Sequence, residues 1–296
     1  MTTQGLSIVI PQYSQEVVSL LDRLETCIPN HLLYEFIVAN DNDNASYPQT
    51  KEWLTKRGFH YVQNPKNIGR AKNRNQLAKA SQYDLLLFID EDMMPKNSVF
   101  IERYLNALDE SDVVVGGHIY EENSPKSPYR LHWKYGSTIE AKASSNAANR
   151  SFSSAVFGIK KSCFQSVSFE SSIQDYGHED SLFGASLDQH NYTIQFIDEP
   201  CYHLGLHSNT TFVSRSHTAI QTLYQIETTI DNPASHKLTR LQRTYATRKR
   251  SISGRIVLQG IQIARPLWKW MAIQWSSVPA LQLYKLSCYC HLKQMR

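Results

Sequence analysis

The stretch Leu85-Leu-Leu-Phe-Ile-Asp-Glu-Asp92 runs from consecutive apolar residues into three carboxylates. A short apolar run that ends abruptly in polar residues predicts a buried strand over 85–89. Ligands of open α/β sheets bind at the carboxyl ends of the strands, where these carboxylates lie. Alternate residues of a strand point the same way, so we expect Asp90 and Asp92 to face one cation. Carboxylate oxygens, completed by substrate phosphates, suit Mg²⁺ or Mn²⁺.

Strand and helix patterns alternate on both sides of this stretch. The other predicted strands cover Leu6–Pro11, Glu35–Ala39, His60–Gln63, Asp112–Gly117, Phe152–Ile159 and Thr193–Ile197, and the predicted helices cover Glu16–Cys27, Asn67–Ala80 and Glu179–Leu187. This alternation predicts an α/β fold with a mixed, mostly parallel central sheet flanked by helices. The Ser-, Asn- and Ala-rich stretch 137–149 is expected to be a loop or an insertion.

The composition is that of a folded chain with a basic end. Of its 296 residues, 41% are hydrophobic and 20% are charged, which excludes intrinsic disorder. Twelve of the 31 Lys and Arg residues lie between Lys237 and Arg296, where Asp and Glu are absent. A basic tail on an acidic body predicts a polyanionic partner surface.

Cysteine usage and the first residues favour a reducing, cytoplasmic location. The five cysteines are odd in number, widely scattered and free of a paired CxxC spacing. Residues 1–5 lack a basic segment followed by an apolar run of signal-peptide length. We therefore expect a cytoplasmic protein without a structural zinc site.

The predicted helix over 67–80 begins with cations. Arg70, Lys72 and Arg74 lie in its first turns, although a helix dipole favours cations at the opposite end. A helix N-terminus with nearby cations suits an anionic ligand such as a phosphate. The alternative is an exposed polar helix face.

Five motifs together resemble those of family 2 glycosyltransferases of the GT-A fold. They are Ser7-Ile-Val-Ile-Pro-Gln-Tyr13, the loop at Asp41, Asn67-Ile-Gly-Arg-Ala-Lys-Asn-Arg-Asn75, Phe88-Ile-Asp-Glu-Asp92 and Gly177-His-Glu-Asp-Ser-Leu-Phe-Gly184. Their order and spacing match the family over roughly residues 6–210, and five motifs in order are more specific than one. The resemblance implies a nucleotide-sugar donor.

The resemblance implies roles for the donor-binding residues. Asp41 would pair with the nucleotide base, and Pro11 and Tyr13 would form the floor beneath it. Arg70 or Arg74 would face the phosphates. Asn40, Asn42 and Ser14 depart from the usual family residues, which leaves the identity of the base open; a UDP-sugar is our expectation.

The resemblance also implies the metal ligands and the general base. Asp90 and Asp92 match the family's DxD element, and His203 matches a histidine that completes the metal site. Asp180 matches the general base, with Glu179 as second choice. A carboxylate that only takes the acceptor's proton gives a single displacement with inversion.

Each of these residues also has a simpler structural interpretation. Asp90 and Asp92 could be a solvated strand end, and Glu179 with Asp180 could be the acidic first turn that a helix dipole favours. A lone histidine such as His203 beside an apolar strand is more often packed or capped than a ligand. The family context favours the functional interpretation.

The end of the chain predicts an amphipathic helix with Pro266 as a kink or break. One stripe at steps of three and four consists of Val257, Ile261, Ala264, Trp268, Met271 and Trp275, and Arg255, Arg265 and Lys269 lie opposite. The apolar segment between Lys269 and Lys285 is too short to cross a bilayer. A helix with basic residues and Trp on opposite faces suits an anionic membrane surface, and the alternative is a helical cap packed on the catalytic domain. Nucleic acid is not expected, because no recognition motif is present.

The sequence thus predicts a GT-A catalytic domain over 1–230 and a basic amphipathic helical tail over 231–296. The expected activity is metal-dependent, inverting transfer of a sugar to a hydroxyl of a glycan or lipid-linked saccharide, in surface polysaccharide or glycolipid assembly at the cytoplasmic membrane. One alternative is a sugar nucleotidyltransferase, which would have a Gly-rich basic loop after the first strand, where this chain has Pro11-Gln-Tyr-Ser14. The other is a catalytically silent adaptor that binds glycans or membranes.

Overall fold

The computed structural model describes residues 5–141, 151–231, 233–236 and 238–294, which form two compact units. The first unit comprises Met1–Glu121, Glu140–Gln174 and Ser186–Gly205, and the second comprises Glu122–Ile139, Asp175–Ala185 and Leu206–Arg296. Of the stretch 137–149 predicted as a loop or insertion, residues 142–149 lie outside the described residues, whereas residues 137–140 belong to a π-helical turn and not to a loop.

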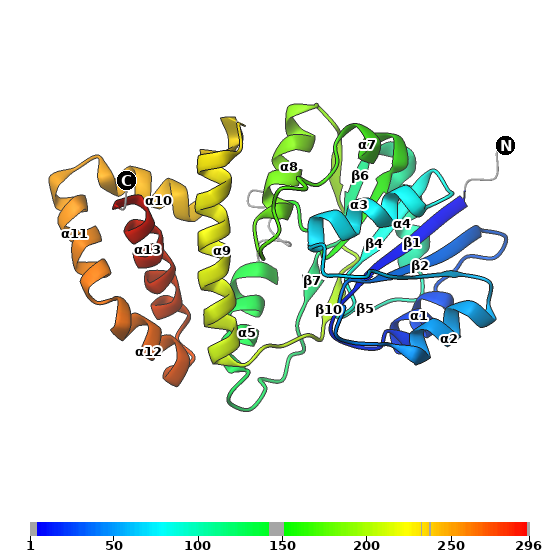
Figure 1. Ribbon diagram of the computed structural model, residues 1–296, viewed down its shortest axis with the longest axis horizontal. Helices are drawn as coiled ribbons and strands as arrows, with labels where there is room; N and C mark the ends of the chain where they lie inside the picture. Colours follow the sequence, from blue (N-terminus) through cyan, green and yellow to red (C-terminus); the bar gives the residue numbers. More distant parts are fainter. Residues whose placement is uncertain (1–4, 142–150, 232, 237, 295–296) are drawn as a thin grey trace. The chain divides into compact units, whose positions relative to one another are not determined.

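A seven-stranded mixed sheet forms the centre of the first unit (Figure 1). In spatial order its strands are β3 (His60–Gln63), β2 (Leu33–Asn40), β1 (Gly5–Gln12), β4 (Leu85–Ile89), β8 (Val156–Lys160), β6 (Val113–Val115) and β9 (Ile194–Phe196). β8 is antiparallel to both of its neighbours, and the other pairs are parallel. The predicted mixed, mostly parallel sheet is confirmed.

The helices that flank the sheet within the first unit are α1 (Val18–Glu25), α2 (Pro48–Lys56), α3 (Arg70–Ala80), α4 (Phe100–Glu110) and α7 (Lys161–Ser166). In α1 and α4 the buried apolar residues recur at helical spacing. Another helix, α8 (Glu179–Gln189), begins in the second unit. All five residues of β4 are buried, as expected for a strand covered on both faces. Phe88 stacks on Phe157 of β8 with ring centroids 4.6 Å apart. The pairing of β4 with β8 continues to Ile89, directly before the carboxylates.

The register brings three loops to one edge of the sheet. Gln12 of β1 pairs with Asn40 of β2, and Val9 of β1 pairs with Phe88 of β4 in the same direction. Parallel strands end on the same side, so the residues that follow β1, β2 and β4 share an edge. A second, three-stranded sheet consists of β5 (Met93–Pro95), β10 (Cys201–His203) and β7 (His118–Ile119). It continues directly from the carboxylates after β4.

The second unit is helical. Its elements are α5 (Arg130–Tyr135), a π-helical turn (Gly136–Glu140) whose last residue, Glu140, belongs to the first unit, α9 (Asn209–Thr229), a 3-10 turn (Pro233–His236), α10 (Arg240–Lys249), α11 (Ile252–Ile263), α12 (Arg265–Trp275) and α13 (Val278–Gln294). Pro266 lies in the first turn of α12, so the predicted break separates α11 from α12 at Ala264. Proline is tolerated there because the first helical N–H groups lack an intrahelical partner.

The C-terminal helices pack on α9 through a common apolar cluster that includes Phe212, Leu223, Ala272, Leu281 and Tyr289. Much of the predicted amphipathic stripe therefore packs inside this unit: Trp268 and Met271 contact this cluster, and Ile261 contacts a neighbouring one. The boundary at residue 230 stays a prediction; the compact units divide elsewhere, because α9 shares its core with the tail. Within the described residues, no helix is both long and apolar enough to traverse a bilayer.

Candidate active site

Tyr13 follows β1 as an exposed aromatic ring on a fixed backbone. Its backbone oxygen accepts hydrogen bonds from the Asn42 side chain at 2.8 Å and the Tyr47 hydroxyl at 2.6 Å. Tyr13 is 49% exposed, while Pro11 of β1 is half-buried. An exposed ring whose backbone is held in place is suited to stacking against a planar ligand.

Glu91, which sequence reasoning did not single out, anchors the other side of this loop. Its carboxylate accepts hydrogen bonds from the backbone N–H groups of Tyr13 and Ser14 at 2.8 and 3.0 Å and from the Ser14 hydroxyl. Burial raises the pKa of Glu91, and these donors act against that rise. The middle residue of Asp90-Glu-Asp92 therefore ties the loop after β4 to the loop after β1.

Asp41, expected to pair with the nucleotide base, is only 4% exposed and forms hydrogen bonds within the chain itself. One oxygen accepts hydrogen bonds from the Asn64 side chain and the Ile68 N–H, and the other accepts from the Gly69 N–H, all at 2.9 Å. Asp41 thus fixes the turn that starts α3. Its pairing with a base stays a prediction.

The carboxylates after β4 lie in a turn, not in the continuing strand that alternation assumed. β4 ends at Ile89, and the Met93 N–H donates to the Asp90 carbonyl, which reverses the chain. Asp90 and Asp92 consequently have different partners. The Asp90 carboxylate accepts a hydrogen bond at 2.8 Å from Arg74, whose side chain is 1% exposed.

Of the two arginines expected near phosphates, Arg74 is thus buried against Asp90, and Arg70 at the start of α3 is exposed. Arg70 acts electrostatically on Asp92. Phosphate contact by either arginine stays a prediction, and exposure favours Arg70.

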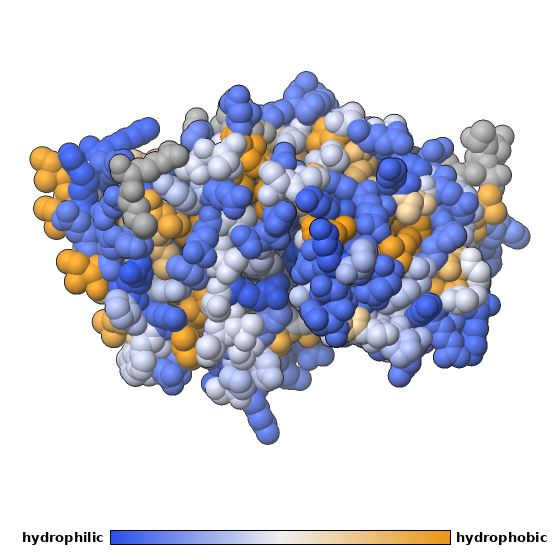
Figure 2. All heavy atoms as spheres, viewed as in Figure 1, coloured by the Kyte–Doolittle hydropathy of each residue, from blue (hydrophilic) through white to orange (hydrophobic). Residues whose placement is uncertain are grey.

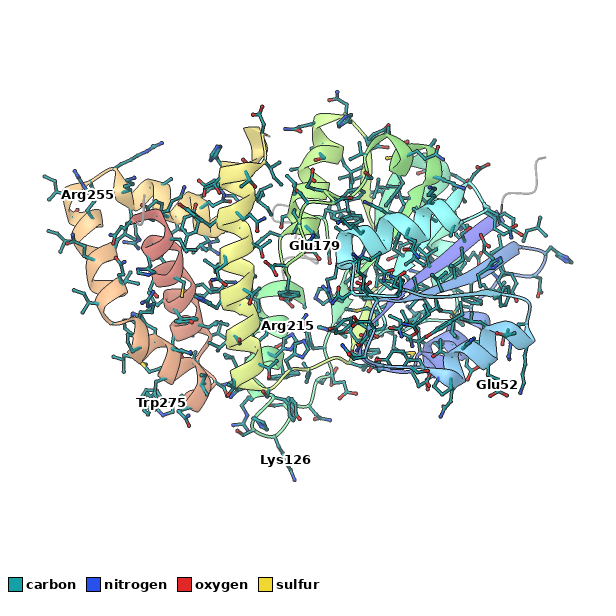
Figure 3. The ribbon with its side chains drawn as sticks, in the orientation of Figure 1. Glu52, Lys126, Glu179, Arg215, Arg255 and Trp275 are labelled. Carbon is teal, nitrogen blue, oxygen red and sulfur yellow. The ribbon has the colours of Figure 1, made fainter. Side chains whose placement is uncertain are left out.

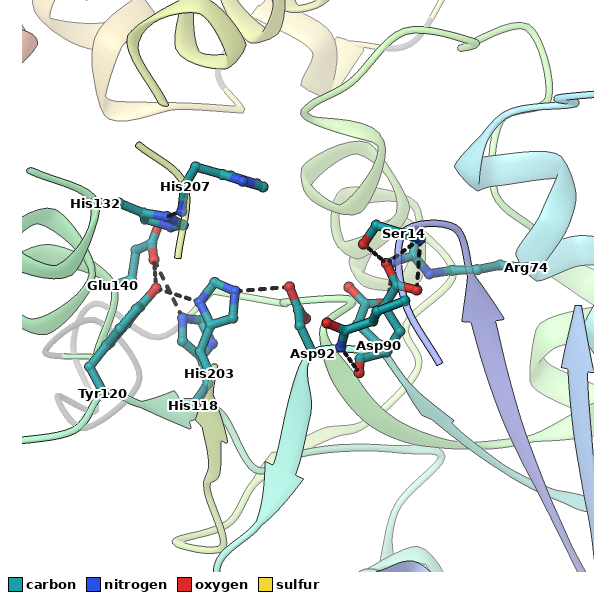
Figure 4. A network of polar contacts seen from close by, with 12 residues as sticks. Ser14, Arg74, Asp90, Asp92, His118, Tyr120, His132, Glu140, His203 and His207 are labelled. Atoms are coloured by element: carbon teal, nitrogen blue, oxygen red, sulfur yellow. Dashed lines mark hydrogen bonds and ion pairs between the residues drawn. The ribbon is translucent and has the colours of Figure 1, made fainter. Parts of the chain in front are cut away.

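His203 of β10 lies against Asp92, as Figure 4 shows, with Nε2 3.2 Å from Oδ2. The strand pairing of His203 with Met93 brings these residues together, although 111 positions separate Asp92 from His203 in the chain. Burial raises the pKa of Asp92, but the hydrogen bond and charge of His203, with the charge of Arg70, hold that pKa below its ordinary value. Burial lowers the pKa of His203, but the hydrogen bond and charge of Asp92 outweigh burial, so the pKa of His203 lies above its ordinary value.

Tyr120 and Glu140, which sequence reasoning missed, orient the His203 ring (Figure 4). The Tyr120 hydroxyl donates to Glu140 at 2.6 Å and contacts Nδ1 of His203 at 2.8 Å. Because that hydroxyl has one proton, its oxygen accepts from Nδ1–H. A neutral His203 then directs its Nε2 lone pair towards Asp92, so a proton or a cation is needed between the two acceptors. Metal-binding histidines are oriented by such a partner on the other ring nitrogen.

The donor set at Asp92 and His203 fits a divalent cation completed by substrate oxygens. Neighbouring ligands of an octahedral ion lie about 3 Å apart when each bond is about 2.1 Å long, close to the separation of the two side chains. Among the described residues, no group of three or more His, Cys, Asp or Glu side chains is arranged to hold a metal.

Glu179 and Asp180 belong to the second unit and open α8. Glu179 is labelled in Figure 3. Glu179 is buried and accepts from the Gly177 N–H at 3.2 Å, whereas Asp180 is half-buried and accepts from the Ser181 N–H at 2.6 Å. Gly177 and His178 both have positive φ, 109° and 66°. This turn requires glycine first, because a Cβ at Gly177 would lie 2.6 Å from the Ala219 Cβ.

The profile of "Glycosyl transferase family 2" matches residues 7–170, which is more than half of the chain. The chain belongs to glycosyl transferase family 2. It is therefore a transferase enzyme, and the matched region contains every loop of the first sheet edge described above. No curated protein matches the chain by sequence.

Solved structures share the fold of this glycosyltransferase at low identity. A mannosyltransferase from Pyrobaculum calidifontis, PcManGT, in complex with GDP-Man and Mn²⁺, is 13% identical with a TM-score of 0.62, covering 99% of this chain and 87% of that one. TarS 1-349 from S. aureus in complex with UDP is 15% identical with a TM-score of 0.51, covering 99% and 92%. The same TarS segment in complex with UDP-GlcNAc is 15% identical with a TM-score of 0.50, and the match covers 99% of this chain and 93% of that one. The predicted GT-A fold is confirmed.

Proposed function

We propose that this enzyme transfers a sugar, with inversion and with the help of a divalent cation, from a nucleotide-diphosphate sugar to a hydroxyl acceptor. The observation that carries the proposal is the Asp92–His203 pair with its Tyr120–Glu140 support at the end of β4. A site of this kind suits the diphosphate of the donor. Mn²⁺ or Mg²⁺ is the proposed ion, and it would supply charge neutralisation for the departing diphosphate.

Residues of the first unit bind and orient the donor in this proposal. The exposed ring of Tyr13 stacks on the base, and the turn held by Asp41 presents the start of α3 and Arg70 to the phosphates. Asp92 and His203 would hold the cation, and Asp90, which binds Arg74 in this structure, would have to turn from that arginine to act as the further ligand. The base is proposed to be uracil; solved structures of the same fold carry UDP or GDP-Man.

Asp180 is the proposed general base. It takes the proton of the acceptor hydroxyl while that oxygen attacks the anomeric carbon, and the bond from that carbon to the diphosphate breaks. A positioned carboxylate contributes a factor of about 10² to 10⁴ in rate. Asp180 is favoured over Glu179 because the Glu179 side chain is buried at 4% exposure and bonded to the turn.

The acceptor is proposed to be a glycan or lipid-linked saccharide in surface polysaccharide or glycolipid assembly on the cytoplasmic side. All five cysteines are free thiols, which is consistent with a reducing compartment.

Variants of the two aspartates test this division of roles. Asp92→Ala should abolish cation-dependent donor binding, whereas Asp180→Asn should bind donor nearly normally and lose about 10² to 10⁴ in transfer rate. Donor binding is measured calorimetrically across nucleotide sugars with Mn²⁺ or Mg²⁺, and transfer by release of nucleoside diphosphate.

Asp109→Asn, on the exposed face of α4, is the matched control and should leave both measurements unchanged. Equal loss of donor affinity in the Asp92 and Asp180 variants would refute the assignment. Nucleotide-sugar binding without turnover by the unaltered chain would favour the adaptor, and formation of nucleotide sugar from sugar phosphate would favour the nucleotidyltransferase.

A further inference from the structure

An open groove of about 680 Å³ lies between α10 and α11 in the second unit. Its basic side chains are Arg240, Arg243 and Arg248 of α10. The first residues of α11, including Ser253 and Gly254, line the same groove. Both the arginines and the N–H groups of a helix start attract an oxyanion.

The close approach of the two helices is built into the sequence at Gly254. A Cβ there would lie 2.0 Å from the Arg248 carbonyl oxygen, so only glycine fits. Ser251 caps α11 by accepting a hydrogen bond from the Gly254 N–H at 3.0 Å. The start of α11 is therefore held beside the arginines.

Among the described residues, no carboxylate lines this groove. In the described part of the chain, none of these three arginines forms an ion pair with a carboxylate, and the last acidic residue of the sequence is Asp231. Guanidinium groups gathered without carboxylates repel one another, and an anion in the groove relieves that repulsion.

An apolar stripe runs along α11, the helix whose first residues line the groove. Ile252, Ile256 and Ile263 follow one another at steps of four and seven, and their side chains are 73%, 63% and 83% exposed. Figure 2 shows hydrophobic atoms over α11 beside hydrophilic ones. Val257, another exposed residue, lines the groove itself. We call Ile252, Ile256 and Ile263 the α11 stripe.

Helix α12 also exposes apolar side chains. Leu267, Trp270 and Trp275 are each about half exposed, and the two indole rings meet edge to face with centroids 4.9 Å apart. Arg255 and Trp275, labelled in Figure 3, mark the basic and the aromatic parts of this surface. Indole rings beside basic residues favour the boundary between water and hydrocarbon.

We propose that the α10–α11 groove binds the phosphate headgroup of an anionic membrane lipid while the α11 stripe enters the outer part of the bilayer. Three arginines match the charge of the headgroup, and the exposed isoleucines match the hydrocarbon beneath it. A nucleic acid would engage the arginines but leave the isoleucines in water, so lipid accounts for both halves of the surface. This site is independent of the donor-binding site in the first unit.

Vesicle binding by the full chain tests the proposal. The chain should co-sediment with phosphatidylcholine vesicles that contain phosphatidylglycerol, and much less with phosphatidylcholine alone. Arg240→Gln, Arg243→Gln and Arg248→Gln combined should weaken that binding about 100-fold, because each basic residue near an anionic surface contributes about fivefold. The matching triple Arg→Lys variant should keep most of the binding.

A charge-matched control separates the groove from general attraction. Lys51→Gln, Lys66→Gln and Lys79→Gln combined remove the same formal charge from exposed positions in the first unit and should bind the vesicles normally. Replacing the three isoleucines of the stripe by Ser should weaken vesicle binding by about tenfold or more. All variants should bind nucleotide sugar as the unaltered chain does.

Equal binding to neutral and anionic vesicles would overturn the proposal, as would a loss of vesicle binding in the lysine control as large as in the arginine variant. Displacement of the chain from vesicles by inorganic phosphate, at the same concentration as the lipid phosphate, would also overturn it. So would preferential binding to RNA when RNA and vesicles compete for the chain. Displacement by inorganic phosphate would make the groove a site for a soluble anion, and RNA capture would make it a nucleic-acid surface. None of these results would bear on sugar transfer, which is measured separately.

Discussion

Gly205 places the backbone directly against the Asp92 carboxylate. A Cβ at Gly205 would lie 2.2 Å from Asp92 Oδ2 and 2.8 Å from its Cβ, and the neighbouring Leu204 N–H donates to the Asp92 carbonyl at 2.9 Å. A side chain at 205 would therefore have to displace the carboxylate that faces His203. The absence of a side chain here is part of the geometry of the proposed cation site.

Gly205→Ala is accordingly expected to weaken cation-dependent donor binding by about tenfold or more, a loss typical of disturbing the surroundings of a metal ligand. Isothermal titration with a nucleotide sugar and Mn²⁺ measures the effect. The overall fold should persist, because the displaced group is a side chain at the edge of the sheet.

Gly260→Ala is the matched control, since a Cβ at Gly260 in α11 meets no heavy atom within 4 Å. It should leave donor binding unchanged and raise the stability of the helix by up to about 1 kcal/mol. Unaltered donor affinity in Gly205→Ala would remove the steric argument for Asp92.

Single residues also show which parts of the site a sequence can reveal. Asp92 and His203 are found through motifs, but their contact depends on β10 pairing with β5, which lies beyond the reach of local patterns. Tyr120 and Glu140 carry no motif, and their role follows from one hydroxyl between a carboxylate and an imidazole. The expectation that Asp90 and Asp92 point the same way assumed a continuing strand, but a turn begins at Asp90.

At the scale of elements, α9 and α13 are joined through Glu227. Its carboxylate accepts hydrogen bonds from Lys293 at 2.7 Å and from Tyr289, both on α13, and from His236 at 3.1 Å. Burial raises the pKa of Glu227, but these three partners outweigh burial and hold that pKa below its ordinary value of 4.5. The ionised form therefore stabilises the packing of the two helices.

Glu227→Gln should lower the free energy of unfolding by roughly 1–3 kcal/mol at neutral pH, because hydrogen bonds to a buried charge are lost. A carboxyl whose pKa is lower in the folded state stabilises above the ordinary pKa and loses that contribution as pH falls through the folded value. The difference between the unaltered chain and the variant should thus be full at pH 7 and shrink below about pH 4.5. Denaturant titration at several pH values measures it.

The control for this pair is Glu52→Gln, which breaks an exposed pair with Lys56 within α2 and should change stability little. A constant difference between pH 7 and pH 3 for Glu227→Gln would contradict the ionic explanation.

Long, strongly patterned elements could be predicted, and short ones could not. β3 and β4 occupy the predicted residues because apolar or β-branched runs meet clear polar ends. β7 has two residues and β5 and β10 have three each, too few for periodicity, and they form only by pairing with one another. The predicted stripe of the tail was correctly helical, but a helical pattern does not tell a core face from a membrane face.

At the scale of the whole molecule, composition and packing divide the chain differently. The charge changes sign near residue 231, which suggests a separable tail. The packing of the second unit continues across that point, because buried residues of α9 and α13 form one cluster. Asn209 of α9 adds buried hydrogen bonds to the Ile273 carbonyl at 2.8 Å and the Ser276 hydroxyl at 3.0 Å.

A chain that ends at residue 230 should therefore fail to remain soluble and folded. It would expose Phe212, Val213, Ile220 and Leu223 of α9, which lie within the shared cluster, and each large apolar side chain loses about 1.5–3 kcal/mol when its burial is lost. Buried Asn209 would also lose two acceptors for its amide. The soluble fraction after expression, dye binding to exposed apolar surface and the thermal transition measure the outcome.

A chain that ends at Ser277 gives the graded comparison, because it keeps α12 and both acceptors of Asn209 but lacks α13. It should be destabilised less than the chain that ends at 230, and more than the full chain. Should the 1–230 chain instead stay soluble and unfold in a cooperative transition as sharp as that of the full chain, the tail would be an independent domain. The cluster shared by α9 and α13 would then contribute little to stability, and the predicted boundary at 230 would mark a true domain border.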